Sequence, residues 1–359
     1  MADISKVNGV ALASINKIDG IAKSSIGKVY GQTIPSASYT SVNSIAFDGT
    51  NDYAETSGLT IPTAAGSVSL WFKFGTTTST NVLFNWHHYG TSGTLDEYFD
   101  IRLQNNSNNP AARGLMAIYR GDGTNQSCSM KTSSSHHGTG FSRWKYNYDG
   151  VSSGTTWPHF EYNANDLIQA GSHSYSPSEG SDHGWHHVVV TWDVSEAYTG
   201  KDAQSSHKYR PTASHDGTTT NHTGTMRIYM DGTLRNFGQS LFPSYNYQRT
   251  PFGMTEITGT VNEVRIGGRG NNANYTEANI SDVSVFNAKL DDDAVTAMYN
   301  SGAPTDLTSN SGDYDYASNL IGYWKFQEGS GTSIADDSSN SNNLTLYNSP
   351  SWDNGDAPS

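Results

Sequence analysis

The fold is decided by two segments, GWHHVVVTWD at residues 184–193 and MRIYMDG at residues 226–232. In both segments apolar residues occupy every second position, which is the period of a β-strand with one buried face. The residues on this apolar face are Val188, Val190 and Trp192 in the first segment and Met226, Ile228 and Met230 in the second. The second segment ends in Asp-Gly, which is typical of tight hairpin turns. Together the two segments predict a pair of antiparallel strands.

The same period recurs elsewhere, which extends the predicted sheet structure along the chain. SVSLWFKF at residues 67–74 alternates clearly, so we expect Val68, Leu70, Phe72 and Phe74 to face inward. The other segments are IAFDGTNDY at 45–53, EVRIGG at 263–268 and ISDVSVF at 280–286. These half-buried strands predict an all-β protein.

These segments resemble the laminin-G and pentraxin branch of the concanavalin A-like jelly rolls. The resemblance implies a concanavalin A-like jelly-roll β-sandwich over residues 41–302, with long insertions at 85–182 and 195–225. It also implies a short helix after the last strand. Carboxylates favour the start of a helix and glycine suits its C-terminal cap, and the residues expected in these roles are Asp291, Asp292, Asp293 and Gly302.

Composition and charge restrict the partners of this 359-residue chain. Its formal net charge of −13 argues against nucleic acid, because binding to phosphates depends on Lys and Arg. Cys128 is the sole cysteine, so no internal disulfide forms. We find neither an export-signal pattern nor an apolar run of about 18 residues, and we therefore expect no membrane insertion. A protein that folds in a host cytoplasm and is released by lysis, as part of a virus particle, fits this pattern.

The N-terminus contains a repeat of 11 residues, with units beginning at Ile4, Ile15 and Ile26. Each unit has a turn dipeptide ending in Gly between short apolar pairs, which predicts tight turns and very short strands. Similar repeats occur in structural proteins of marine tailed phages. We expect residues 1–34 to be an attachment arm that orders against copies of itself or another virion protein, with 35–40 as a linker. The residues expected to mediate assembly are Ile4, Val7, Ile15, Ile18, Ile26 and Val29.

The C-terminal block, residues 303–359, contains LIGYWKFQEGSG at 320–331 and DDSSNSNNLTLY at 336–347. These resemble the opening segment of the family, which normally precedes the other strands. Three arrangements are open: a circular permutation in which these strands complete the same sandwich, an exchange that completes a neighbouring subunit, and a small separate domain. We favour permutation, because elements usually pack within their own domain.

Catalytic acids are weakly indicated. Glycoside hydrolases of this fold need two carboxylates that flank the scissile bond. The segment from Asp96 and Glu97 to Asp100 lacks the expected spacing, and Glu161 stands alone. We therefore expect no enzymatic activity.

Metal binding is considered at two kinds of residue. Of the three His pairs, His186-His187 lies on a predicted strand and points to opposite faces, while His87-His88 and His136-His137 are expected in loops, without identifiable partner ligands. Calcium takes several oxygens from Asp and Asn, although these residues also form turns without any metal. The residues that would hold calcium are Asp48, Asn51, Asp52, Asp337, Asn340 and Asn342.

The insertion predicted at 85–182 is too long for a connecting loop, which indicates an interaction role. Its aromatic residues would stack on sugar faces, anchor a protein contact or pack onto the sheet. The residues we expect to bind a surface glycan are Trp144, Tyr146 and Trp157.

The sequence as a whole predicts a non-enzymatic phage virion protein, decorating the capsid or forming a tail-fibre or appendage subunit, with glycan or host-surface adhesion. A bacterial carbohydrate-binding or adhesin module is the alternative, and a glycoside hydrolase is third.

Overall fold

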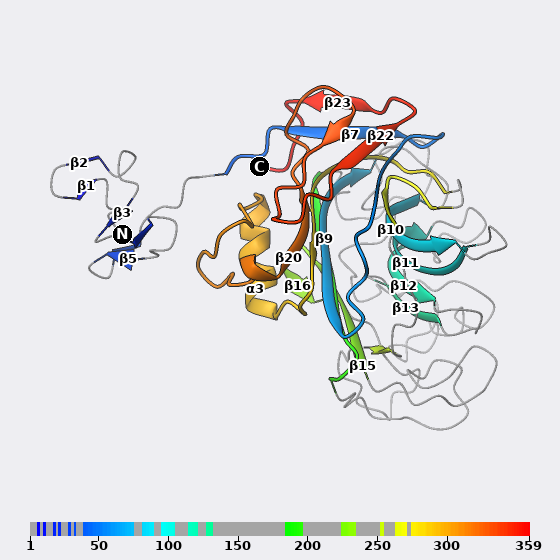
Figure 1. Cartoon of the computed structure of the whole chain (residues 1–359), viewed down its shortest axis with the longest axis horizontal. Helices are drawn as coiled ribbons and strands as arrows, with labels where there is room; N and C mark the ends of the chain where they lie inside the picture. The colour runs from blue at the N-terminus through cyan, green and yellow to red at the C-terminus, as the bar shows by residue number, and fades with distance from the viewer. Residues whose placement is uncertain are drawn as a thin grey trace, which may run out of the picture.

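Two antiparallel sheets packed face to face form the body of the chain, as an all-β jelly-roll sandwich (Figure 1). The computed structural model describes residues 39–74, 184–196, 224–234, 263–270 and 274–359. Outside these ranges it describes the strands named below. Among the described residues, no helix is long and apolar enough to span a membrane.

The nine-stranded sheet contains the segments from which the fold was predicted. Its main path runs β16 (Thr233–Leu234), β15 (Gly224–Met230), β14 (His186–Asp193), β9 (Ala65–Phe74), β19 (Glu277–Phe286), β7 (Asn43–Asp48) and β23 (Ser351–Asn354). Off this path, β17 (Phe252–Met254) pairs with β15 and β20 (Leu320–Trp324) pairs with β19.

The eight-stranded sheet faces it across the core. Its order is β13 (Ser127–Lys131), β12 (Gly114–Arg120), β11 (Leu95–Gln104), β10 (Asn81–Tyr89), β18 (Glu263–Ile266), β8 (Tyr53–Ser57), β22 (Leu344–Tyr347) and β21 (Ser333–Ile334).

The predicted alternation is confirmed in the core. Val188 pairs with Leu70 on one side and with Met230 on the other, so the apolar positions of β9, β14 and β15 share a face. This face is fully buried against the eight-stranded sheet. The Asp-Gly turn is also confirmed, because Asp231 and Gly232 adopt the left-handed φ values of 49° and 72° that a two-residue hairpin between β15 and β16 requires.

The prediction of an insertion over residues 85–182 is wrong for its first half. Residues 85–131 contain most of β10 and all of β11, β12 and β13, which make up one edge of the eight-stranded sheet. Among the described side chains of this stretch, the polar residues Asn85, His87 and Asp100 lie on the outer face of the sheet, and such residues obscured the strand period. His87-His88 likewise lies in β10 and not in a loop. Residues 132–183 and 197–223 lie outside the described part of the chain.

The C-terminal block lies in both sheets of the same chain. In the nine-stranded sheet, β20 pairs with β19 and β23 pairs with β7, while β22 pairs with β8 in the eight-stranded sheet. Of the three arrangements left open by the sequence, the structure has the intramolecular one. The reason is geometric, because β7 and β20 occupy successive halves of one edge of β19.

A buried carboxylate marks the point where these two strands meet. Asp282 lies at an irregularity in β19 with φ 49°, and it accepts hydrogen bonds from four hydroxyl groups. The donors are Tyr39 (2.6 Å), Ser41 (2.9 Å), Ser281 (2.8 Å) and Tyr323 (3.2 Å). Burial raises the pKa of Asp282 to about 6, although these hydroxyls favour the charged form. The network therefore ties the N-terminal and C-terminal strands to β19.

Helix α3 (Asp292–Tyr299) covers the outer face of the nine-stranded sheet, on the side of β9 away from β10 to β13 (Figure 1). Asp291 is its N-cap and accepts from the backbone N–H of Ala294 (2.8 Å), which agrees with the predicted acidic start. The prediction of Gly302 as the cap is wrong, because the helix ends earlier at Asn300, in a left-handed conformation that asparagine tolerates. Two short 3₁₀ turns follow, η4 (Asn300–Gly302) and η5 (Ala317–Asn319).

This covered face has its own apolar cluster. Its buried members are Val189, Tyr229, Phe286, Leu290, Val295, Met298, Leu307, Tyr314, Leu320 and Tyr323. Ser69 and His187 lie beside this cluster, with 2.7 Å between Oγ and Nε2. Burial lowers the pKa of His187 to about 4, so the imidazole is neutral at physiological pH.

The N-terminal repeats form three separate strand pairs, as the turn dipeptides predicted. These are β1 (Lys6–Val7) with β2 (Val10–Ala11), β3 (Lys17–Ile18) with β4 (Ile21–Ala22), and β5 (Lys28–Val29) with β6 (Gln32–Thr33).

Candidate functional site

The outer face of the eight-stranded sheet carries charged and aromatic side chains where the other sheet carries α3. The strand period explains this difference on β18. Val264 and Ile266 point into the core, so the alternating residues Glu263 and Arg265 point outward. Register then aligns polar residues across neighbouring strands. Arg265 pairs with Asn85 on one side and with Glu55 on the other. A continuous polar surface therefore runs across β10, β18 and β8.

An aromatic pair lies at one end of this surface. The rings of Tyr53 on β8 and Tyr347 on β22 stack with centroids 4.8 Å apart. The guanidinium of Arg265 lies 3.9 Å from the centroid of Tyr53, so it also contacts this ring. Tyr347 is 41% exposed, among the largest exposures of the described apolar and aromatic residues. The stack therefore fixes an exposed phenol ring on a rigid strand.

The opposite end of the surface is polar but buried. Asp100 on β11 accepts from Asn85 (2.5 Å) and lies 3.3 Å from the Nε of Arg269 and 3.6 Å from Arg102. Burial raises the pKa of Asp100, while the two arginines and Asn85 oppose this rise. Because the carboxylate is paired and enclosed, this end is structural, and Asp100 is not available as a catalytic acid.

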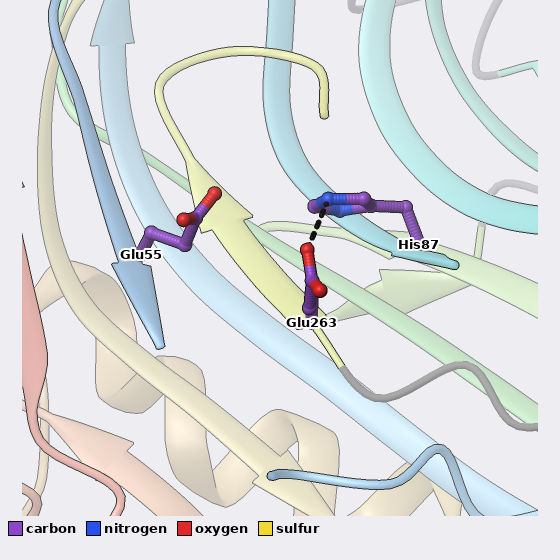
Figure 2. Close-up of side chains that lie close together, drawn as sticks. All are labelled: Glu55, His87 and Glu263. Atoms are coloured by element: carbon purple, nitrogen blue, oxygen red, sulfur yellow. Dashed lines mark ion pairs between the residues drawn. The ribbon is translucent and has the colours of Figure 1, made fainter. Parts of the chain in front are cut away.

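Three side chains with ligand atoms meet between these ends. Glu55 on β8, His87 on β10 and Glu263 on β18 each direct one nitrogen or oxygen to a common region, and these atoms lie within 4.8 Å of one another (Figure 2). His87 and Glu263 are direct cross-strand partners, with 3.1 Å between Nε2 and Oε2. Glu55 is held by Arg265 Nε at 2.7 Å. His87 is fully buried, while both glutamates are partly exposed.

The candidate glycan-binding residues Trp144, Tyr146 and Trp157 lie outside the described residues, as does Glu161. The backbone of Asp96 and Glu97 is part of β11, but their side chains also lie outside the described part. The predicted ligand site in this segment therefore stays a prediction.

The first group of calcium candidates forms one turn after β7. The Oδ1 of Asp48 accepts from the backbone N–H of Thr50 (2.7 Å) and of Asn51 (3.4 Å). Burial and the nearby Asp48 carboxylate raise the pKa of Asp52. Two neighbouring carboxylates of this kind suit a hard cation, although the contacts of Asp48 are also those of a metal-free turn.

The second group of calcium candidates makes contacts with β20 and the residue after it. The amide nitrogens of Asn340 and Asn342 donate to the backbone carbonyls of Leu320 (3.4 Å) and Ile321 (3.1 Å). Asp337 lies 3.4 Å from the Nζ of Lys325. These side chains join the C-terminal loop to β20, and calcium binding by this group stays a prediction.

The residues expected to mediate assembly fall partly in the described strands. Val7, Ile18 and Val29 end β1, β3 and β5, each in the same position of its repeat. Ile4, Ile15 and Ile26 lie outside the described residues.

Sequence reasoning missed the surface across β8, β18 and β22. A signal existed in EVRI at 263–266, where charged residues alternate with buried apolar ones. The partners of these charges could not be found, since β8, β10, β18 and β22 are distant in sequence and only their pairing brings them together.

No protein-family model matches this chain, and no curated protein matches its sequence. Among solved structures, a candidate carbohydrate binding protein from Bacteroides ovatus ATCC 8483 is 14% identical, with 93% of this chain and 67% of that chain covered and a TM-score of 0.43. A heptameric pentraxin from Limulus polyphemus is 11% identical over 85% of this chain and 94% of that chain, with a TM-score of 0.37. Tailspike protein 2 of the Escherichia coli O157:H7 bacteriophage CAB120 is 12% identical over 79% of this chain and 26% of that chain, with a TM-score of 0.40. At such identities the ligand has to be inferred from the chain's own residues.

Proposed function

We propose that the protein is a non-enzymatic carbohydrate-binding module whose ligand binds on the outer face of the eight-stranded sheet, at Tyr347. The observation that carries this proposal is the exposed Tyr347 ring, stacked on Tyr53 and followed by the Arg265–Glu55 ion pair. A fixed aromatic ring offers a flat apolar surface to the C–H face of a pyranose. The adjacent guanidinium and carboxylate supply hydrogen-bond donors and acceptors for sugar hydroxyls.

The charge of the chain favours a neutral glycan. A net charge of −13 repels sulfated and uronic polymers, and Glu55 and Glu263 add negative charge at the surface itself. Arg265 is the nearby cation, and it is already paired with Glu55. We therefore expect neutral hexose-containing glycans to bind better than acidic ones.

A glycan array with the full chain tests this proposal. Neutral glycans are expected to bind, Tyr347→Ala to weaken binding at least tenfold, and Tyr347→Phe to retain it, since the ring and not the hydroxyl forms the platform. Trp144→Ala and Trp157→Ala serve as comparison variants. If they abolish binding while Tyr347→Ala does not, the site lies in the segment predicted from sequence, and the sheet face is the wrong assignment.

The absence of catalysis is part of this proposal. Oxygens of Glu55 and Glu263 lie within 4.8 Å, near the separation of about 5–5.5 Å used by retaining glycosidases. Here, however, Glu55 accepts a hydrogen bond from Arg265, and Glu263 is paired with His87. We therefore expect neither carboxylate to act on the leaving group of a bound glycan. We expect no release of reducing sugar from the bound glycan. Turnover that disappears in both Glu55→Gln and Glu263→Gln would assign a hydrolase instead.

A second candidate function concerns assembly, and the repeated hairpins favour it. Three strand pairs at an 11-residue spacing present Val7, Ile18 and Val29 in equivalent positions. Each pair is too short to be stable alone, so a repeated partner would stabilise all three. We propose that residues 1–34 attach the sandwich to a larger particle, as in a phage capsid decoration or tail-fibre protein assembled in the host cytoplasm.

Deletion of residues 1–34 tests the attachment role. The sandwich is expected to remain folded, while particle association or self-association is lost. Mass spectrometry of purified virus particles would detect the chain directly. Unchanged association after the deletion would contradict an attachment role for the repeats.

Calcium at the Asp48 turn is proposed as an addition to this function. Asp48, Asn51 and Asp52 supply carboxylate and amide oxygens, and an ion there would relieve the repulsion between the two carboxylates. A melting temperature that rises with calcium, and falls back with chelator, is expected in the wild type but not in Asp52→Asn. An unchanged melting temperature in the wild type would count against the ion.

A further inference from the structure

The side chains of Glu55, His87 and Glu263 converge from three neighbouring strands that are far apart in the sequence (Figure 2). Register explains the convergence. His87 pairs directly with Glu263. Glu55 lies on the next strand, two residues before Ser57, which pairs with Glu263. Since all three lie on outward positions of their strands, their side chains share the outer face of the sheet.

The donor atoms and their spacing suit a metal ion. Two ligands bound at 2.0–2.1 Å to one tetrahedral ion are about 3.3 Å apart. His87 Nε2 and Glu263 Oε2 are 3.1 Å apart, and the carboxylate of Glu55 completes a set within 4.8 Å. One imidazole with two carboxylates is a donor set for zinc and related ions, whereas calcium prefers oxygen ligands throughout. We propose that Glu55, His87 and Glu263 bind one divalent first-row transition-metal ion, of which Zn²⁺ is the representative.

The surroundings hold two of the ligands in place. A Cβ added to Gly270 would lie 2.3 Å from the Cδ2 of His87, so the Gly270 backbone packs directly against the imidazole ring and fixes it. Arg265 donates from Nε to Oε2 of Glu55 at 2.7 Å, which orients this carboxylate. A hydrogen bond behind a ligating carboxylate, such as the one from Arg265, is typical of metal sites.

Charge and access are compatible with an ion. The two carboxylates balance a divalent charge, while Arg265 adds one positive charge that lowers the affinity relative to a site without it. The side chains of Glu55 and Glu263 are 23% and 36% exposed, so the ion can enter from solvent. The metal site shares Glu55 with the proposed glycan site, but metal binding can be measured without a glycan, since Tyr347 is not among its ligands.

Zinc titration of the full chain by calorimetry tests the proposal. The chain has 12 histidines, so some background binding is expected, and the site is defined by the difference between variants. Glu263→Gln and Glu55→Gln keep the shape of the side chain and remove a ligand charge. Each is expected to weaken the tightest site at least tenfold, and His87→Asn to do the same.

Glu196→Gln is the matched control. Glu196 is a partly exposed glutamate in the turn after β14 and is paired with Arg227 of the other sheet at 2.6 and 2.8 Å, so its variant should bind zinc as the wild type does. Melting curves without metal check that each variant folds. A visible absorption spectrum with Co²⁺, present in the wild type and Glu196→Gln but lost in Glu263→Gln, would report the ligand set directly. Equal zinc affinity in the wild type, Glu55→Gln and Glu263→Gln, or no binding at all, would overturn the assignment.

Discussion

The two outer faces of the sandwich are built from the same strand period but differ in the residues they expose. Across the nine-stranded sheet, Ser69, His187 and Phe286 lie beneath α3 and the following segment, where an apolar cluster is buried and the imidazole of His187 is neutral. Across the eight-stranded sheet, the corresponding positions carry Glu55, His87 and Arg265. The first face adds a second apolar cluster to the core, while the second presents charges and an exposed ring. We therefore expect ligands to bind to the outer face of the eight-stranded sheet, and the face covered by α3 to contribute to the stability of the fold.

Removal of a large side chain from the covered face should have the largest effect. Phe286 is fully buried beside Tyr314 beneath the α3 segment. Phe286→Ala is expected to lower the free energy of unfolding by about 3–5 kcal/mol, since it leaves a cavity. Urea denaturation of the variant measures this. A loss below about 1 kcal/mol would mean that the covered face contributes no second core.

The second-largest effect on stability is expected at Gly270, which packs against His87 of the eight-stranded sheet. Gly270→Ala places a methyl group against the ring of His87, so a destabilisation of about 1–3 kcal/mol is expected from the forced shift. A double-mutant cycle with His87→Ala checks the cause. If the ring is the obstacle, Gly270→Ala should cost much less once the ring is removed. Strict additivity of the two changes would contradict close packing at this position.

The covered face should also show a pH effect through Asp282, whose pKa is raised to about 6 from an ordinary 3.8. Because the folded state holds this proton more tightly, the stability it contributes is present below pH 3.8 and is lost as pH rises through 6. The Asp282→Asn side chain does not titrate, so the variant does not lose this stability as pH rises. Between about pH 5 and about pH 7.5 the variant should therefore gain on the order of 1 kcal/mol relative to the wild type.

This pH effect has to be measured as a difference between variant and wild type. His187 has a lowered pKa of about 4, so it makes the folded state more stable as pH rises over the same range. The two groups oppose each other in the wild type. Denaturation curves at several pH values should show that the free energy of unfolding rises more steeply with pH in Asp282→Asn than in the wild type. Parallel profiles would contradict a raised pKa of Asp282.

The smallest effect is expected at the exposed ring. Tyr347→Ala should change the free energy of unfolding by less than about 1 kcal/mol, because it removes a half-exposed ring and one stacking contact. The glycan affinity of the same variant should fall at least tenfold. A large loss of stability, with affinity unchanged, would place Tyr347 among the structural residues and remove the distinction between the two faces.

The core of the fold could be predicted from local pattern. Val68, Leu70 and Phe72 occupy every second position of β9, and this period alone places them between the sheets. The polar face was harder to predict. On β10, Asn85 and His87 interrupt the apolar pattern, so the segment resembled a loop although Phe84 and Trp86 lie in the core. The C-cap at Asn300 rather than Gly302 was likewise missed, because asparagine also adopts the left-handed conformation that ends a helix.

The amino-acid sequence by itself determined that the chain forms half-buried strands, the tight Asp-Gly turn after β15 and three short strand pairs in the repeats, because each depends on residues a few positions apart. The tertiary structure decided that the C-terminal strands complete the same sandwich, and that Tyr53 meets Tyr347 and His87 meets Glu263. These contacts depend on the register between strands that are distant in the chain. Register is fixed only when both sheets bury their apolar faces together, since a shift by one residue would turn every core side chain outward.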